Sequence, residues 1–389
     1  MMITPEIMAE SNIELIKFMA DNPLVNSPSF FSCTLNADYN HMDSTVVLSV
    51  SGGQTSMMMA ALIKSTLPYH NVVCIFANTG LENEETLQFV DQCDKAFNLN
   101  VQWIEAVTNP IHGKGVTHRA TNFNDAFRCH QYKEHDHPFH AHVRKNGVPN
   151  MARPQCSDRL KEFAIEHYKK VNGLKGYPHS LGMRDDEPLR AMPKPIRNIL
   201  DNIDVTPKQF RVMSHQHRLN TYTGSCHGYW KLEDEHDFSE YEKIERYSNK
   251  LKKYNLVYLL ADAWQLDKQD VELFWEAQPF RLQLKEHQGN CQTCWKKSDK
   301  KLLLLAIETP TQFEAFGWYE KTYSHVKPLK NGDARFFRRQ RTAGMILGEA
   351  KLMDLYALRK SVIGSKDATD SDGCGSSCES YALGDLEAA

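Results

Sequence analysis

Two groups of residues in this sequence have the types and the spacing that chemistry requires. The first is a Cys-x-x-Cys pair, Cys291 and Cys294, which stands shortly before an apolar helical run at 302–307. Two thiols at this spacing can serve one metal centre or one redox reaction, and a nearby helix N-terminus favours their thiolate forms. Taken alone, the pair fits zinc, an iron–sulfur cluster or a redox dithiol equally well.

A third cysteine, Cys156, stands at the expected start of a helix at 158–171 and is flanked by two arginines. Both features stabilise a thiolate. Three thiolates are one short of a closed structural zinc site, but they can hold a four-iron cluster and leave one iron open. We therefore expect Cys156, Cys291 and Cys294 to bind a metal centre. Zinc, with Cys226 or a histidine as the fourth ligand, is the alternative.

The second group is a glycine corner between a strand and a helix. Residues 45–50 are apolar and β-branched, as in a strand buried inside a parallel sheet. Gly52 and Gly53 then allow a ligand to approach the backbone closely, and Thr55 and Ser56 begin a helical run. Free N–H groups and hydroxyls at a helix start bind anions, so we expect a phosphate here. A purely structural corner is the alternative.

The elements that must position these groups follow from hydrophobic patterning. Residues 71–78 predict a second buried strand, 84–97 an amphipathic helix, and 100–105 a third strand. Their order predicts an α/β fold with a doubly wound, Rossmann-like parallel sheet, whose ligands lie at the carboxyl ends of the strands. The remaining patterns make the C-terminal region mostly helical and predict helices at 5–20, 233–254 and 267–275 and a strand at 257–260.

Three segments resemble one enzyme family. Residues 51–56, Ser-Gly-Gly-Gln-Thr-Ser, are similar to the pyrophosphatase loop (PP-loop) of the adenine nucleotide α-hydrolase superfamily. Residues 78–82, Asn-Thr-Gly-Leu-Glu, resemble the DTGLE segment of phosphoadenosine phosphosulfate (PAPS) reductases, and 182–190 resemble their GIRxxES segment. The order is that of the family. Gln54 stands where the family usually has Lys or Arg, and Asn78 where it usually has Asp.

The resemblance implies an enzyme that binds ATP or PAPS, and it allows Mg²⁺ beside the nucleotide. It makes Cys156 and Arg184 catalytic candidates. Cys374, followed by glycine in the tail, resembles the nucleophilic cysteine of PAPS reductases, although the surrounding tail sequence differs. The residues implied in nucleotide binding are Ser51, Gly52, Gly53, Gln54, Thr55, Ser56, Asn78, Thr79, Gly80, Glu82, Lys161 and Arg190.

Two kinds of reaction are known in this superfamily. Some members adenylate an acceptor with ATP, and sulfur or nitrogen then attacks it; others reduce PAPS to sulfite with a cysteine. The three-cysteine set favours adenylation and sulfur transfer and resembles that of cluster-dependent nucleic-acid thiolation and DNA phosphorothioation enzymes. The tail cysteines favour reduction. Either reaction implies a sulfur or electron donor protein. The alternative is a non-catalytic nucleotide-binding or nucleic-acid-binding protein with structural zinc, which Gln54 supports.

Two further segments have unusual composition. Residues 327–341 hold six Lys and Arg side chains around Phe336 and Phe337, a patch that could bind a nucleic-acid acceptor. A solvated basic helix is the alternative. Seven histidines lie between His112 and His142, and we interpret this stretch as a polar loop over the active site rather than a metal site.

Composition sets the class of protein. With 389 residues, 41% apolar and 24% charged, the chain is typical of a globular protein. We expect a cytoplasmic protein without a membrane span or a disulfide scaffold, and we leave a homo-oligomer open. A net charge of −3 gives no general attraction to nucleic acid. The predicted regions are an N-terminal extension (1–43), a nucleotide-binding domain (44–230), a helical Cys-x-x-Cys region (231–363) and a flexible acidic tail (364–389).

Overall fold

The structure of this protein is a computed structural model. The structure describes residues 2–22, 25, 45–67, 71–187, 192, 194–202, 205–211, 214, 238–285, 287–330 and 332–363. Three residues with a predicted role lie outside this part of the chain: Arg190, Cys226 and Cys374. No described helix is long and apolar enough to cross a membrane. The proposed region boundaries stay predictions.

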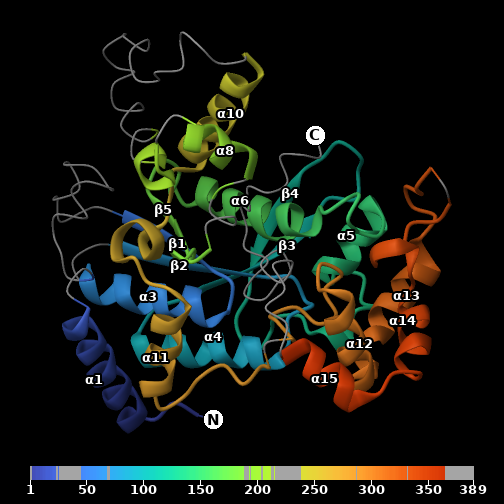
Figure 1. Ribbon diagram of the computed structural model, residues 1–389, viewed down its shortest axis with the longest axis horizontal. Coiled ribbons are helices and arrows are strands. Elements are labelled where there is room, and N and C mark those ends of the chain that lie inside the picture. The colour runs from blue at the N-terminus through green and yellow to red at the C-terminus, as the bar shows by residue number, and fades with distance from the viewer. Residues whose placement is uncertain are drawn as a thin grey trace.

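A mixed, mostly parallel sheet forms the centre of the molecule (Figure 1). Within the described residues its strand order is β4-β3-β2-β1-β5-β6, and only the β3–β4 pair is antiparallel. The strands are β1 (Thr45–Val50), β2 (Asn71–Asn78), β3 (Gln102–Thr108), β4 (Val116–Ala120), β5 (His179–Leu181) and β6 (Leu256–Val257).

The strand order confirms the predicted doubly wound α/β fold. The chain adds β2 and β3 on one side of β1 and places β5 and β6 on the other side. The order of the strands therefore reverses between β1 and β5. At such a switch point the connections leave in opposite directions and open a crevice at the carboxyl ends of the two strands. The glycine corner follows β1, so it lies at this point. The antiparallel edge strand β4 was not predicted.

Helices cover both faces of the sheet (Figure 1). Strand β1 is buried along its whole length, with Val46, Leu48 and Val50 in one hydrophobic cluster and Val47 in the other. The first cluster includes residues of α1 (Pro5–Asp21), α3 (Gln54–Thr66), α4 (Glu84–Phe97) and α11 (Lys268–Ala277). The second includes residues of α5 (Pro138–Asn146), α6 (Phe163–Val171), α8 (Lys194–Asn202) and α10 (Phe238–Tyr254).

Four C-terminal helices extend the second cluster beyond the sheet. They are α12 (Asp299–Glu308), α13 (Glu314–Tyr323), α14 (Ala343–Ala350) and α15 (Leu355–Ile363). Phe316 of α13 lies 6.2 Å, between ring centroids, from Phe139 of α5. Aromatic packing thus holds the predicted helical region against the nucleotide-binding region, and the helical character of the C-terminal region is confirmed.

Two predictions about the C-terminal region are wrong. The strand predicted at 257–260 ends at Val257, and a π-helical segment, Leu259–Trp264, follows it. In the basic patch, Phe336 and Phe337 are 0% and 3% exposed because they pack against Phe316. They therefore cannot stack on bases. The patch is also not a helix beyond the short turn Arg338–Gln340. A nucleic-acid partner as such stays a prediction.

The histidine-rich stretch is not a simple loop, because it contains β4 and α5. His137, His140 and His142 are buried at the start and in the body of α5. Burial lowers the pKa of His137 to about 4 and that of His142 to about 3, so both rings are neutral at neutral pH. The N-cap of α5 is His137, whose ring accepts the amide of His140. These histidines are structural parts of the helix.

A buried carboxylate predicts a pH-dependent stability. Glu320 of α13 accepts the amides of Phe336 at 3.1 Å and Ala343 at 2.8 Å, and burial raises its pKa from 4.5 to about 7. The folded state thus holds this proton more tightly than the unfolded state. Stability contributed by the protonated group is fully present below the unfolded pKa of about 4.5 and is lost as the pH rises through 7.

We therefore expect Glu320→Gln to remove part of this pH dependence. The melting temperature of the variant minus that of the native chain should increase from pH 5 to pH 8. Thermal denaturation at four pH values measures it, with Glu314→Gln, an exposed position of the same helix, as the control. A difference that stays constant with pH would contradict the expectation.

Candidate functional site

The glycine corner is held in shape by its own side chains. The amide of Ser51 donates to Oγ of Ser56 at 3.1 Å, and that hydroxyl donates to the carbonyl of Gly53 at 3.0 Å. Gly52 has φ +80°, and a Cβ there would lie 2.5 Å from Cγ2 of Thr86. Only glycine therefore fits at position 52 without moving α4.

The corner leaves backbone donors available. Helix α3 begins at Gln54, so its first turn has N–H groups without helical acceptors. Among the described residues, no acceptor receives the amide of Gly52 or Gly53. These donors and the positive end of the helix dipole form the kind of nest that binds a phosphate. An anion bound at this corner stays a prediction.

Arg184 brings a positive charge to the corner from the other side of the switch point. It follows β5, and its Nη1 donates to Oγ1 of Thr55 at 3.1 Å. Two carboxylates hold the guanidinium of Arg184 in place. Asp186 lies 2.8 Å from Nε of Arg184, and Glu187 lies 3.3 Å from its Nη2. Two segments singled out in the sequence thus meet here, through the hydrogen bond from Arg184 to Thr55.

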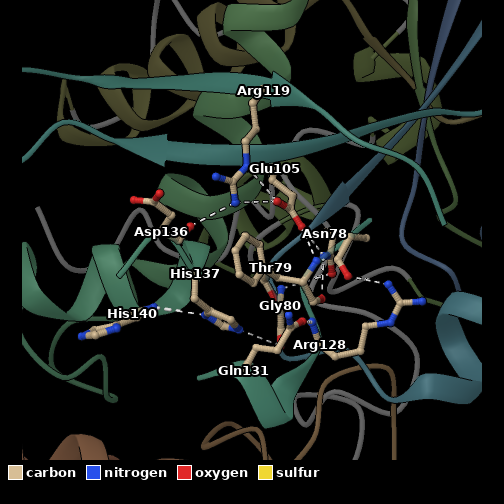
Figure 2. A network of polar contacts seen from close by, with 12 residues as sticks. Asn78, Thr79, Gly80, Glu105, Arg119, Arg128, Gln131, Asp136, His137 and His140 are labelled. Carbon is tan, nitrogen blue, oxygen red and sulfur yellow. Dashed lines mark hydrogen bonds and ion pairs between the residues drawn. The ribbon is translucent and has the colours of Figure 1, made fainter. Parts of the chain in front are cut away.

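Asn78, at the end of β2, is the centre of a buried polar network (Figure 2). Its Nδ2 donates to Oε1 of Glu105 at 2.7 Å and to the carbonyl of Phe127 at 3.0 Å, while its Oδ1 accepts the amide of Gly80 at 3.1 Å. Glu105 also accepts two N–H groups of Arg119, at 2.7 and 2.9 Å. Asp at position 78 would place two carboxylates in contact, which explains the asparagine.

The turn after Asn78 is shaped by a histidine and a glutamate. The Nε2 of His137 lies 3.2 Å from the carbonyl oxygen of Gly80 (Figure 2). A Cβ at Gly80, where φ is +81°, would lie 2.4 Å from the same ring nitrogen. The carboxylate of Glu82 accepts both the amide and the hydroxyl of Thr79, at 2.8–2.9 Å. The turn is therefore fixed from both sides.

The three cysteines predicted to act together line one cavity. Cys156, Cys291 and Cys294 share a cavity of about 30 Å³, and none of them is in a disulfide. Its walls are mainly apolar and aromatic, with Leu81, Phe139, Leu160, Trp295 and Phe316. Residues that are 135 positions apart in the sequence, from Cys156 to Cys291, thus meet at one place.

A buried ion pair adjoins the thiols. Glu82 is 2% exposed, and its Oε1 lies 3.7 Å from Sγ of Cys291 and 3.7 Å from Nζ of Lys161. Lys161 also lines the cavity. The structure thus places this lysine, which the sequence suggested for a phosphate, beside the thiols and Glu82. Its contact with a phosphate stays a prediction.

A short strap, residues 289–292, joins the corner, the turn and the cavity. Asn290 donates from Nδ2 to the carbonyl of Ser51 at 3.1 Å and accepts the amide of Asn83 at 2.8 Å. The amide of Gln292 donates to the carbonyl of Leu81 at 2.8 Å. The cysteine pair therefore begins on a strap that is bonded to both the glycine corner and the turn at 79–83.

Sequence reasoning missed three residues of this site. Glu105 lies inside a strand, Trp275 donates from Nε1 to the carbonyl of Gln54 at 3.0 Å, and Asn290 directly precedes the cysteine pair. A Gly-Asn dipeptide before Cys-x-x-Cys is a turn signal that could have marked Asn290. Nothing in the local pattern separates Trp275 from an ordinary core aromatic.

A site for a single metal ion is not formed in the described part of the chain. There, no group of three or more His, Cys, Asp or Glu side chains gathers closely enough to hold one ion.

Comparisons with known proteins find a family model and several similar proteins. Residues 45–206 match the family model of the phosphoadenosine phosphosulfate reductase domain. An uncharacterized nin region protein of Escherichia phage lambda, ORF290, is 25% identical over 345 residues, which cover 86% of this chain and 94% of that protein. This similarity extends beyond the matched domain into the C-terminal region.

Two further proteins are similar over less of their length or less closely. A glutamine-hydrolyzing GMP synthase of Borreliella burgdorferi strain N40 is 40% identical over 67 residues, 16% of this chain and 12% of that protein. Among solved structures, the U34-tRNA thiolase NcsA from Methanococcus maripaludis, with its [4Fe-4S] cluster, matches with a TM-score of 0.32 and 11% identity. That match covers 87% of this chain and 90% of the thiolase chain.

The polar network predicts that the family's usual aspartate is harmful here. Asn78→Asp would put a second carboxylate beside Glu105, and we expect unfolding by urea at pH 8 to become easier by about 3 kcal/mol. The loss should be smaller at pH 5, because one of the two carboxyls can then hold a proton.

A compensating change makes this test specific. The double variant Asn78→Asp/Glu105→Gln removes the carboxylate pair, so it should recover part of the lost stability and give a favourable coupling energy in a double-mutant cycle. If Asn78→Asp alone were as stable as the native chain at pH 8, the explanation of Asn78 would be wrong.

Proposed function

We propose that this chain is an enzyme that binds an adenine nucleotide at the glycine corner and performs sulfur chemistry at the thiol-lined cavity, because residues 45–206 match the family model of the phosphoadenosine phosphosulfate reductase domain. One observation carries the proposal. Cys156 meets Cys291 and Cys294 in a single cavity, and the strap that leads to the last two is bonded to the corner through Asn290.

The corner residues would hold the phosphates of ATP or PAPS. The amides of Gly52 and Gly53 and the hydroxyl of Thr55 are donors at the positive end of α3. Arg184, bonded to Thr55, would offset the negative charge that grows on the phosphate oxygens in the transition state. Its two carboxylate partners keep the guanidinium in one orientation, so little ordering is needed during the reaction.

Three thiolates that leave one iron open are a donor set that suits a four-iron cluster. Each thiolate would bind a different iron atom, and all three thiols line one mainly apolar cavity. Cys156, Cys291 and Cys294 would hold the cluster, and it would supply an open iron for sulfur. Oε1 of Glu82, 3.7 Å from Sγ of Cys291, would accept the thiol proton, and Lys161 would offset thiolate charge.

The reaction that this arrangement supports best is adenylation followed by sulfur transfer. An acceptor oxygen would attack the α-phosphorus of ATP and release pyrophosphate. Sulfur from a donor protein would then attack the activated atom and release AMP. Reduction of PAPS is the second candidate, which the family match supports. Its proposed nucleophile, Cys374, lies outside the described residues.

Nucleotide binding tests the first half of the proposal. We expect Gly53→Asp to weaken nucleotide binding at least tenfold, about 1.4 kcal/mol, because its carboxylate would repel the phosphates. Its backbone φ of −89° tolerates a side chain, so the fold should persist. Separate calorimetric titrations with ATP and PAPS measure the effect and identify the preferred nucleotide.

The matched control for this substitution is Gly115→Asp. Gly115 is exposed, and a Cβ there would meet nothing within 4 Å. This variant should bind as tightly as the native chain. The proposal fails if the native protein binds neither nucleotide, or if Gly53→Asp binds as well as the control.

Metal analysis tests the second half. We expect protein purified without oxygen to contain iron and acid-labile sulfide, and each single change of Cys156, Cys291 or Cys294 to Ser to remove most of both. Cys74→Ala, which alters a buried thiol in the core of the opposite sheet face, should leave the iron content unchanged. One equivalent of zinc without iron would instead favour a non-catalytic binding protein.

A further inference from the structure

Four cationic side chains from separate segments gather beside the thiol-lined cavity. We call Lys145, Arg153, Arg159 and Lys327 the cationic face. Lys145 lies in the last turn of α5, the two arginines flank Cys156, and Lys327 lies on the loop after α13.

Backbone contacts hold the three segments together. The chain at Gly147, just after α5, packs so closely that a Cβ there would lie 2.1 Å from the carbonyl oxygen of Val326. The guanidinium of Arg153 donates to the carbonyl of Lys327 and, at 3.0 Å, to that of Pro328. The end of α5, the turn that carries Cys156 and the loop at 326–328 therefore form one continuous surface.

The charges on this surface are not neutralised by carboxylates of the described residues. There, no salt bridge involves any of the four side chains, and Lys145 instead donates to the carbonyl of Lys114 at 2.7 Å. Arg159 and Lys327 lower the pKa of Lys145, after the larger effect of burial, which shows that the three cations influence one another. Cations that repel each other in this way favour an anionic partner.

The rest of the basic segment behaves differently. Arg341 pairs with Asp299 and with Glu349, and Arg339 lies 3.9 Å from Asp299. Together with the burial of Phe336 and Phe337, these pairs remove most of the patch that the sequence suggested at 327–341. Of that segment, Lys327 is the residue that joins the cationic face.

The cationic face borders the proposed reaction site. Cys156, Ser157 and Leu160 line the cavity, and Arg153 and Arg159 lie on the same turn of chain. A polyanion held by the arginines would therefore run past the thiols.

We propose that the cationic face binds the phosphodiester backbone of a single-stranded nucleic acid and so presents a base, as the sulfur acceptor, to the thiol-lined cavity. The identity of the acceptor rests on the proposed function, whereas the binding itself does not. A single strand is the suitable form, because its bases are unstacked and can reach a reaction site. The bound backbone would release counterions, so binding weakens as salt rises.

Fluorescence anisotropy tests this proposal. It measures the binding of labelled single-stranded DNA and RNA of mixed sequence between about 50 and 200 mM salt. The variant is Lys145→Glu/Arg159→Glu/Lys327→Glu, which leaves Arg153 and its backbone bonds in place. We expect at least tenfold weaker binding and a loss of about 2 in the slope of log K against log salt, from three phosphate contacts of about 0.7 each.

A control with the same change of charge is available on the other face of the sheet. Lys17, Lys95 and Lys268 lie on α1, α4 and α11 and are 63%, 57% and 57% exposed. Lys17→Glu/Lys95→Glu/Lys268→Glu should bind the strand nearly as well as the native chain. Equal losses in the two triple variants would show that only net charge matters and would overturn the proposal.

Three further results decide the remaining cases. Binding of either DNA or RNA through the cationic face supports the proposal. Polyglutamate that displaces the labelled strand as readily as unlabelled strand does would overturn it and would favour an acidic protein partner.

If the triple variant does not melt cooperatively, the exposed single change Lys327→Glu replaces it. Titration of ATP and PAPS into the same variants separates the two proposals: intact strand binding without nucleotide binding overturns only the proposed function.

Discussion

The docking of the strap at 289–292 on the turn at 79–83 is the interaction on which the candidate site depends. Backbone hydrogen bonds of 2.8 Å at both Asn83 and Gln292 fix the strap, and the side chain of Asn290 extends it to the carbonyl of Ser51. Without this contact Cys291 and Cys294 would have no defined position relative to the corner or to Cys156. The site is therefore a product of long-range docking, although each of its motifs is short and local.

Several buried carboxylates and amides near the strap are fully paired, which helps to keep this arrangement rigid. Glu105 accepts N–H groups from Asn78, Arg119 and Phe127, and Glu82 is shared by Thr79 and Lys161. In the low dielectric of the interior a fully satisfied network resists displacement, because each group would lose partners that water does not replace there. Such stiffness suits a site whose donors must already point at their ligand when it arrives.

Much of the fold was readable from the sequence, because its signals are local. The bounds of β1, β2 and α4 follow from burial patterns that neighbouring residues set, and the corner follows from Gly52. The three cysteines were expected together, and the shared cavity confirms that they are. By contrast, β5 has only three residues, which are too few for a periodic pattern. The buried face of α5 contains polar histidines, so it does not show as an apolar stripe in the sequence. Phe336 and Phe337 were misread because their partners, such as Phe316, are distant in sequence.

Two hydrogen bonds to the glycine corner also show that residues far apart in the sequence shape the proposed nucleotide site. They come from Asn290 and Trp275. In a planar trans peptide the C=O and the next N–H point in opposite directions. Asn290, by holding the carbonyl of Ser51, therefore aims the N–H of Gly52, and Trp275, by holding the carbonyl of Gln54, aims that of Thr55. Both donors lie outside residues 45–206. The later part of the chain thus helps to set the direction of amides that lie inside the matched domain.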